Sequence, residues 1–197
     1  MKLADARKDQ FRRLAKDQGY RARSAYKLLQ LNASYRFLKR GGKVVDLGSA
    51  PGGWLQVITK AVGPAGKVVG IDLKPVEPVE EATVFEGNIE DPGMIDKISN
   101  CLGGSADVVL SDLAPNVSGI WDVDQARQIS LSTAALGLAR QLLRHGGTGV
   151  FKVFEGSMMD EFRAELKKSF GHVLLSKPSA SRQQSSELYV VCFDYKR

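Results

Sequence analysis

Short runs of apolar residues alternate along the chain with longer segments in which apolar residues recur every three or four positions. The runs are typical of strands buried on both faces, and the longer segments are typical of amphipathic helices. We predict strands at 44–47, 68–71, 83–85, 106–110, 148–154, 173–175 and 188–193. Helices are predicted at 4–17, 24–38, 54–61, 91–98, 124–143 and 158–170. This alternation predicts an α/β layered fold with a mostly parallel sheet.

The last two predicted strands have no helix between them. A polar segment rich in Ser, Arg and Gln separates them at 177–187, and we predict a loop there. Parallel neighbours need a long crossover, usually a helix, so the final strand is expected to run antiparallel. The sequence shows no repeat and no linker, and its 197 residues predict a single domain, 1–197, with a sizeable core.

Positive charge is concentrated near the N-terminus. Residues 1–43 contain 13 Lys and Arg against 3 Asp and Glu, whereas the whole chain has 28 against 22. The first predicted helix carries basic side chains at Arg7, Lys8, Arg12, Arg13 and Lys16. Such an uneven distribution favours a polyanionic partner, although a solvated surface helix would show the same charges. We therefore interpret 1–40 as a basic helical arm for nucleic acid and 41–197 as the core.

Composition excludes several other classes of protein. No apolar stretch approaches the roughly 20 residues that span a bilayer, and the N-terminus has no hydrophobic signal core. We expect a cytoplasmic monomer without membrane contact. Cys101 and Cys192 lie far apart in apolar or helical contexts, so reduced thiols are expected and no metal site is predicted.

The most informative motif is the segment 43–54, KVVDLGSAPGGW. An apolar strand ends at Gly48, a turn with one proline and two glycines follows, and helical spacing resumes at Trp54. In a doubly wound sheet this first turn lies outside the carboxyl end of the strand, where nucleotide-like ligands bind. The turn lacks the G-x-G-x-x-G spacing of dinucleotide sites, which argues against a nicotinamide-dependent oxidoreductase. Asp72 ends the second strand, where an acid suits a ribose diol.

The order D-x-G-x-x-P-G-G-W resembles the first motif of S-adenosylmethionine-dependent methyltransferases, and its P-G-G-W ending resembles the FtsJ/RrmJ-type RNA ribose 2′-O-methyltransferases. Four further segments resemble blocks of that family, in the family's order: 24–28 (SAYKL), 111–119 (SDLAPNVSG), 152–156 (KVFEG) and 177–189 (KPSASRQQSSELY). The resemblance covers nearly the whole chain. It implies a Rossmann-like methyltransferase fold with helices on both faces of the sheet, S-adenosyl-L-methionine as cofactor and RNA as substrate.

The resemblance also implies roles for individual residues. The family's catalytic Lys-Asp-Lys-Glu tetrad matches Lys27, Asp112, Lys152 and Glu187. Cofactor contacts are implied for Gly52, Trp54, Asp72, Asn88 and Asp112. The family commonly has aspartate where this chain has Asn88. Because an amide keeps an acceptor oxygen and adds donors, the adenine contact is expected to differ in detail.

The expected reaction is in-line attack of a ribose 2′-hydroxyl on the methyl group of a sulfonium. Positioning of the two reactants can supply about 7–11 kcal/mol, and proton removal by a tuned base adds a factor of about 10²–10⁴. We predict that Lys152 removes or steers the hydroxyl proton. Burial and the nearby Lys27 favour its neutral amine, whereas Asp112 and Glu187 favour its ammonium form. The sequence leaves the protonation state of Lys152 open.

Other residues are interpreted from their type and position. Unpaired bases stack on aromatic rings and guanidinium groups, so RNA contacts are predicted for Tyr20, Arg21, Arg23 and Arg182. Trp121 is expected on a flexible loop near the acceptor entrance. His145 and His172 are expected on the surface, since neither has a partner at a useful spacing.

The choice of RNA rests on the compactness of the chain. A single basic arm and no appended domain favour large-subunit ribosomal RNA, with a uridine of 23S-type RNA as the expected target. Transfer RNA is the alternative substrate, because the motifs do not distinguish the two. A non-catalytic RNA-binding module is the alternative from another class, but it predicts broken tetrad positions and all four are present.

Overall fold

A single sheet forms the centre of the protein. The computed structural model describes residues 10–182 and 184–197, within which the strand order is β3-β2-β1-β4-β5-β7-β6. The strands are β1 (Lys43–Leu47), β2 (Lys67–Asp72), β3 (Ala82–Glu86), β4 (Ala106–Ser111), β5 (Leu143–Phe154), β6 (Phe170–Ser176) and β7 (Glu187–Tyr195). The helices are α2 (Gln10–Asp17), α3 (Ala25–Tyr35), α4 (Gly53–Val62), α5 (Met94–Leu102), α6 (Trp121–Leu142) and α7 (Met159–Ser169).

The direction of the last strand confirms the sequence prediction. The strands from β3 to β5 pair in parallel, whereas β7 pairs antiparallel with both β5 and β6. The connection from β6 to β7 contains no helix, so the chain reverses there and β7 inserts between β5 and β6. As a result, the amino end of β7 lies at the same edge of the sheet as the carboxyl ends of the parallel strands, where ligands of such sheets bind.

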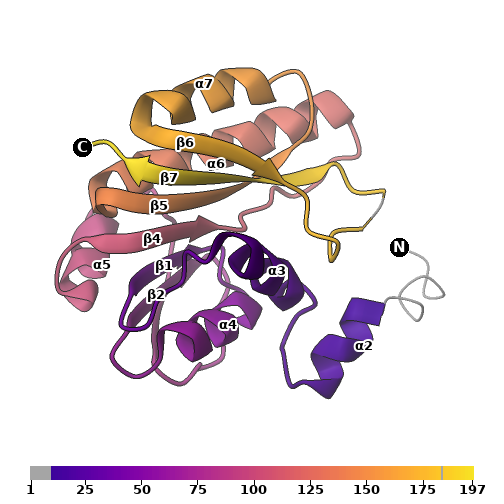
Figure 1. The fold of residues 1–197 in the computed structure, drawn as a ribbon. Helices are drawn as coiled ribbons and strands as arrows, with labels where there is room; N and C mark the ends of the chain where they lie inside the picture. The colour runs from indigo at the N-terminus through magenta and orange to yellow at the C-terminus, as the bar shows by residue number, and fades with distance from the viewer. Residues whose placement is uncertain (1–9, 183) are drawn as a thin grey trace.

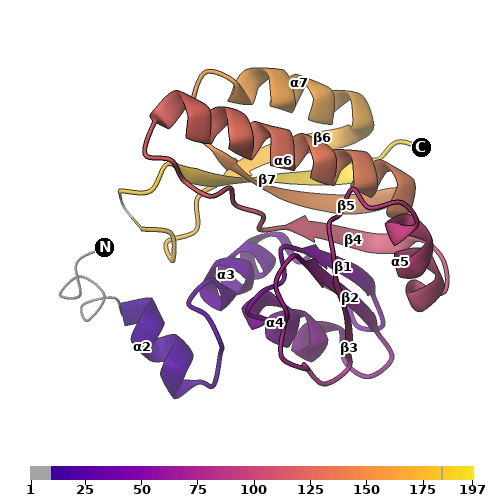
Figure 2. The same cartoon turned by 180° about the vertical axis from the view of Figure 1, so that it is seen from behind.

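Helices cover both faces of the sheet (Figure 1, Figure 2). On one face, α3 and α4 bury Leu28, Leu31 and Ile58 in a core that includes Val44 of β1. On the other face, α5, α6 and α7 form a second core around residues such as Phe151 of β5. The fold is therefore the predicted Rossmann-like α/β arrangement, with apolar strands between two helical layers.

Most helices differ by a few residues from their predicted limits; α3, for example, ends at Tyr35 and not at residue 38. The differences in α6 and α5 have clear causes. Helix α6 begins at Trp121, so the expectation that Trp121 lies on a flexible loop is wrong. The carboxylate of Asp124 accepts hydrogen bonds from the backbone N–H groups of Ser118 and Gly119, which fixes the chain before the helix and lets it start earlier. Helix α5 ends later than predicted, because the stop signal is Gly103 in the left-handed conformation (φ 64°).

The basic N-terminal segment has two structurally different parts. Arg7 and Lys8 lie outside the described residues. Helix α2 lies beside α3 (Figure 1), with the ring of Phe11 at 5.5 Å from that of Tyr26. Helix α3, in contrast, is part of the core, since its own residue Leu28 is fully buried. The boundary between arm and core at 40/41 stays a prediction. Within the described ranges, no helix is both long and apolar enough to cross a membrane.

Candidate active site

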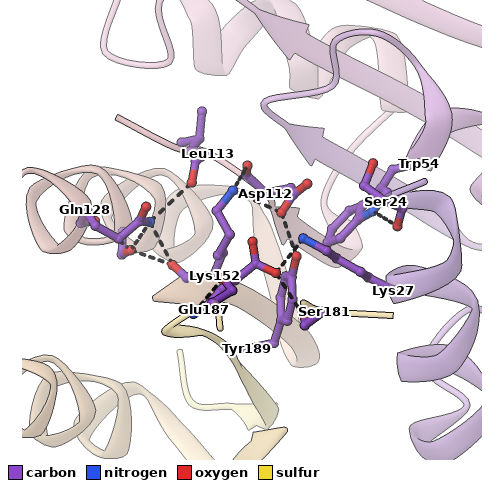
Figure 3. A network of polar contacts seen from close by, with 12 residues as sticks. Ser24, Lys27, Trp54, Asp112, Leu113, Gln128, Lys152, Ser181, Glu187 and Tyr189 are labelled. Carbon is purple, nitrogen blue, oxygen red and sulfur yellow. Dashed lines mark hydrogen bonds and ion pairs between the residues drawn. The ribbon is translucent and has the colours of Figure 1, made fainter. Parts of the chain in front are cut away.

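Four charged side chains from distant parts of the sequence meet at the carboxyl edge of the sheet (Figure 3). Lys27 projects from the first turn of α3, and Asp112 directly follows β4. Lys152 lies two residues before the end of β5, and Glu187 begins β7. The structure thus brings together the four residues that the tetrad motif predicts. Their catalytic roles stay predictions.

Lys27 and Glu187 form one pair. The Nζ atom of Lys27 lies 2.5 Å from Oε1 of Glu187, and the two side chains are only 13% and 12% exposed. The hydroxyl of Ser181 donates to the same carboxylate oxygen at 3.1 Å. The Lys27 amine also lies 5.9 Å from the centre of the Tyr189 ring. Glu187 therefore fixes the position of Lys27 and balances its charge.

Lys152 and Asp112 form the second pair, with a different geometry. The Lys152 amine donates to the backbone carbonyl of Asp112 at 2.6 Å and lies 3.2 Å from Oδ1 of its carboxylate. The same Oδ1 accepts a hydrogen bond of 2.7 Å from the hydroxyl of Tyr189. Burial raises the pKa of Tyr189 well above its usual value, and the charges of Asp112 and Glu187 raise it further. The phenol therefore stays protonated and acts as a donor.

The pairing of β5 with β7 places these groups side by side. Lys152 is paired with Tyr189, and Phe154 is paired with Glu187. Glu187 and Tyr189 are two residues apart, so their side chains leave the same face of β7. Tyr189 is the last residue of the family block at 177–189, but the tetrad motif does not include it. Its spacing of two from Glu187 on a predicted strand was the signal that would have identified it.

Two buried polar residues of α6 support the strand that carries Lys152. Strand β4 ends at Ser111 while β5 continues, so the Lys152 carbonyl has no partner in β4. Gln128 and Ser132 donate to this carbonyl at 3.0 and 2.8 Å, and the Gln128 amide also donates to the carbonyl of Leu113 at 3.2 Å (Figure 3). Gln128 therefore spans the gap that opens between β4 and β5.

Neither Gln128 nor Ser132 belongs to a motif that the sequence predicts to be functional. Both are about 1% exposed, although glutamine and serine in a long helix usually face solvent. The available signal was their spacing, because they lie three to four residues apart on the same helical stripe as the buried Ala135 and Ala139. A polar residue in phase with an apolar stripe must have buried partners, since an unsatisfied polar group there is costly.

A cavity of about 630 Å³ opens beside the second pair. Its walls include Gly48 and Ala50 of the glycine turn, Asp72 at the end of β2, and Asp112. Gly48 has φ 83°, and an added Cβ would lie 3.1 Å from the backbone nitrogen of Leu113. A side chain at this position would therefore strain the turn and collide with the segment after β4.

Asp72 is held in place by the backbone around the cavity. Its Oδ2 accepts the N–H of Ala50 at 2.8 Å, and its Oδ1 accepts the N–H of Lys74 at 2.9 Å. Each carboxylate oxygen keeps a further acceptor site. Asp72 can therefore bind two adjacent hydroxyl groups, which is what a ribose diol requires.

Asp46 is the unusual acid of this region. It is fully buried, and neither of its oxygens has a hydrogen-bond partner. Burial raises its pKa well above the usual value, and the nearby charges of Asp112 and Asp72 raise it further. Among the described residues, Asp46 and Asp72 form no salt bridge. Asp72 and Asp112 both line the cavity, and two carboxylates there favour a cationic ligand. S-adenosylmethionine, a sulfonium with a ribose diol, fits them. Gly48, Asp72 and Asp112 would hold it.

Three of the predicted cofactor residues do not line this cavity. Gly52 (φ 103°) faces the Arg21 guanidinium, which would lie 2.7 Å from an added Cβ. Trp54 is 3% exposed, and its indole N–H donates to the carbonyl of Ser24 at 2.8 Å (Figure 3). Asn88 is exposed after β3, and its side-chain oxygen accepts a backbone N–H at 3.1 Å. Their cofactor roles stay predictions.

Two of the predicted RNA contacts also have a structural task. Arg21 donates to the carbonyls of Glu77 and Pro78 at 2.6 and 2.7 Å. Arg23 donates to the carbonyl of Ala180, in the loop before β7. Both arginines thus fasten the segment that leads into α3 to other parts of the fold. Their contacts with RNA stay predictions.

The cysteines and histidines take no part in this site. Cys101 and Cys192 are unpaired, and burial raises the pKa of the Cys192 thiol. His145 and His172 are exposed, as predicted. In the part of the chain that the structure describes, no group of three His, Cys, Asp or Glu residues could hold a metal ion.

Comparisons with known proteins show to which family the chain belongs. The profile of the FtsJ-like methyltransferase family matches residues 20–195. A relative from Nitrosopumilus maritimus, a ribosomal RNA large subunit methyltransferase E, is 50% identical over 99% of both chains. Another protein of that name, from Methanothrix thermoacetophila, is 51% identical over 96% of this chain and 73% of its own.

Solved structures give the same result for the fold. A crystal structure described as a ribosomal RNA methyltransferase from Plasmodium falciparum has a TM-score of 0.79 at 31% identity, covering 89% of this chain and 98% of its own. A described rRNA methylase from Clostridium thermocellum has a TM-score of 0.56 at 19% identity, over 84% of this chain and 97% of its own, which shows the fold alone. From the match over residues 20–195 and the relatives that align along nearly its whole length, the chain belongs to the FtsJ-like methyltransferase family.

Proposed function

We propose that the protein transfers the methyl group of S-adenosylmethionine to a ribose 2′-hydroxyl of large-subunit ribosomal RNA. Membership of the FtsJ-like family supports methyl transfer, and the names of the relatives support this RNA. We expect it to act in the cytoplasm as a monomer. The unpaired Cys101 and Cys192 fit a reducing compartment.

One observation carries this proposal. The Lys152 amine is held by the carbonyl and carboxylate of Asp112, and Asp112 also lines the cavity behind the glycine turn. A hydroxyl that contacts Lys152 therefore lies next to the space that suits the cofactor. This is the arrangement that in-line transfer between two bound reactants requires.

The roles of the side chains follow from their contacts. When bound, the cofactor supplies an electrophilic methyl group on a cationic sulfur. Lys152 orients the ribose 2′-hydroxyl and receives its proton at Nζ, and the Asp112 carboxylate stabilises the resulting ammonium. The Tyr189 hydroxyl keeps Oδ1 of Asp112 aimed at that amine. Lys27, held by Glu187, places a second positive charge near the oxygen on which negative charge develops.

Methyl transfer from S-adenosylmethionine with a tritiated methyl group tests this function. The substrates are large ribosomal subunits from cells that lack the gene, the RNA purified from them, and transfer RNA. We expect label in the large-subunit RNA, at an internucleotide bond that becomes resistant to alkali because the 2′-oxygen is blocked.

The Lys152→Ala variant is the matched control and should transfer the label about 10²–10⁴ times more slowly. Label found only in transfer RNA would contradict the proposed substrate. Label in an alkali-sensitive position would contradict ribose methylation, because a methylated base leaves the 2′-hydroxyl free to cleave the chain.

A further inference from the structure

An aromatic pair is formed by the exposed Trp121 at the start of α6 and the half-buried Phe154 at the end of β5. The rings of Trp121 and Phe154 stack with centroids 6.1 Å apart and an interplanar angle of 23°. Trp121 is 47% exposed, whereas Trp54 is 3% exposed and its indole donates to a backbone carbonyl. Further apolar side chains are exposed at Val117 and Ile120, just before α6, and at Met158, in the connection between β5 and α7. A concentration of apolar side chains on the surface marks a binding site more often than a random surface does.

Buried polar groups hold this pair in place. Asp124 is 5% exposed, and its carboxylate accepts the backbone N–H of Ser118 at 2.6 Å and that of Gly119 at 3.0 Å. Gln125 is 2% exposed, and with its amide oxygen facing the β5–α7 connection it accepts two backbone N–H groups there, both at 3.1 Å. The start of α6 is therefore fixed to the segment that precedes Trp121 and to the connection that follows β5. A preformed surface binds without a further cost of ordering it.

The aromatic pair lies next to the tetrad. Phe154 is the register partner of Glu187 and follows Lys152 by two residues on β5. At about 3.3 Å per residue, this places Phe154 about 7 Å along the strand from Lys152. The start of α6 lies at the same end of the sheet as the start of α3 and the loop before β7 (Figure 1, Figure 2). A ribose at Lys152 therefore has its own base, or that of a neighbour, within reach of the pair.

The charges around the pair favour a base over a phosphate. Asp122 and Glu155, which flank Trp121 and Phe154 in the sequence, are exposed and negative. They repel a phosphate but not the neutral face of a base. Base–aromatic stacking needs no charge, and unpaired bases of RNA commonly stack on tryptophan and phenylalanine.

From these observations we propose that Trp121 and Phe154 form a stacking platform for an unpaired nucleobase of the RNA substrate, at or next to the nucleotide whose ribose reacts. The inference rests on the proposed function, because it assigns the substrate contact of the same site. It also restricts the substrate class, since a base in a continuous duplex cannot reach the platform. The accepted RNA must present its target in a loop, a bulge or an opened strand.

The first test reads Trp121 directly and needs no turnover. The chain has two tryptophans, so the fluorescence of the Trp121→Phe variant gives the contribution of Trp54 alone. We expect a single-stranded RNA 12-mer to quench Trp121 and to protect it from acrylamide. A duplex of the same length, which carries more phosphates, should leave Trp121 unquenched at equal occupancy. Equal quenching by the duplex, or none by the single strand, would overturn the platform.

The second test measures methyl transfer. Loss of a stacked base costs about 1–3 kcal/mol, so Trp121→Ala should raise the KM for RNA about five- to 150-fold, with less effect on kcat. Trp121→Phe should restore most of the affinity. Leu174→Ala is the matched control, because Leu174 is an apolar side chain of similar exposure (44%) on β6, and its KM should match that of the wild type.

Other results would overturn the platform while leaving methyl transfer intact. An unchanged KM in Trp121→Ala would do so, as would a change in sedimentation in place of RNA affinity, which would assign the patch to contacts between copies of the chain. If the wild type transfers no methyl group to any RNA, the proposed function fails. The quenching experiment then still decides whether the platform binds a base.

Discussion

The two sides of the candidate active site differ in charge. On the cofactor side, the neighbouring strands β1, β2 and β4 bring Asp46, Asp72 and Asp112 together, and burial and mutual repulsion raise the pKa of Asp46. On the acceptor side, Lys27 and Lys152 each lie beside a carboxylate. Asp112 belongs to both sides, because it lines the cavity and contacts Lys152.

This difference matches the charges of the two reactants. A cationic sulfonium is stabilised by surrounding carboxylates, whereas a hydroxyl that is losing its proton is stabilised by amines. Lys27 is paired with Glu187, which is not a cofactor-side acid, whereas the Asp112 carboxylate both lines the cavity and contacts Lys152. One sheet edge can therefore support both halves of a methyl transfer, with Asp112 between them.

The two lysines are also not equivalent. Lys27 contacts a carboxylate oxygen of Glu187 directly, at 2.5 Å. The shortest contact of Lys152 is a neutral backbone carbonyl, at 2.6 Å, and its carboxylate partner is further away and shared with Tyr189. A neutral acceptor holds the amine without demanding its positive charge. This geometry favours Lys152 over Lys27 as the residue that exchanges the proton.

The largest effect is expected for Lys152→Ala, which removes the amine that we propose receives the proton of the ribose 2′-hydroxyl. The kcat for methyl transfer should fall by a factor of about 10²–10⁴, measured in single-turnover experiments with saturating RNA. Affinity for S-adenosylhomocysteine, measured by calorimetry, should not change, because Lys152 does not line the cavity. A parallel loss of cofactor affinity would contradict the assignment of Lys152 to the acceptor side.

Lys27→Ala is the natural partner experiment. It removes an amine from the same side, but one that is already tied to Glu187. We expect a smaller loss of kcat than for Lys152→Ala. If the two losses were equal, or in the reverse order, the proton would have to be assigned to Lys27 instead.

An intermediate effect is expected for Gln128→Leu, which removes the side chain that joins the segment after β4 to β5. The change keeps a similar volume but leaves the carbonyl of Leu113 without its donor and the carbonyl of Lys152 with only Ser132. A lost buried hydrogen bond costs about 1–3 kcal/mol. We expect kcat to fall about tenfold, through displacement of Lys152 from Asp112, with KM for RNA nearly constant.

Gln141→Leu provides the control, since Gln141 lies on the same helix but is exposed. It should leave kcat unchanged. Activity assays well below the unfolding temperature of each variant separate positioning from stability. A Gln128→Leu enzyme with wild-type kcat would show that this side chain has no role in catalysis.

The smallest effect concerns stability on the cofactor side. Because the folded state raises the pKa of Asp46, it keeps a proton that the unfolded chain releases. Below the ordinary aspartate pKa both states are protonated and this difference disappears. Above it, the free energy of unfolding should fall as pH rises, by up to about 1.4 kcal/mol per pH unit, until the raised pKa is reached.

Asp46→Asn should remove this slope, because the amide does not titrate and is nearly the same size. Urea unfolding of the wild type and the variant between pH 5 and pH 8 measures the difference. Parallel pH dependences in the two proteins would show that Asp46 is ionised in the folded state. Burial and the charges of Asp72 and Asp112 would then not raise its pKa as we infer.

Much of the fold could be predicted from local pattern. Apolar runs separated by helical segments indicated the strands, and the missing helix before β7 indicated its reversal. The limits of α6 could not be predicted in the same way. Its start at Trp121 depends on backbone N–H groups of the preceding turn that bond to Asp124, and no periodicity of apolar residues records such a contact.

By itself, the sequence determined which chemical groups are present and the order of their motifs, including the four residues of the tetrad. Only the tertiary structure decided which amine meets which acid. Lys27 reaches a partner 160 residues away, and Lys152 a partner 40 residues away, because the starts of α3 and β7 and the ends of β4 and β5 lie at one edge of the sheet. It also placed Gln128 between Leu113 and Lys152, and left Asp46 buried without a partner. Local propensity acts over one turn or one strand, whereas these contacts depend on strand order and register.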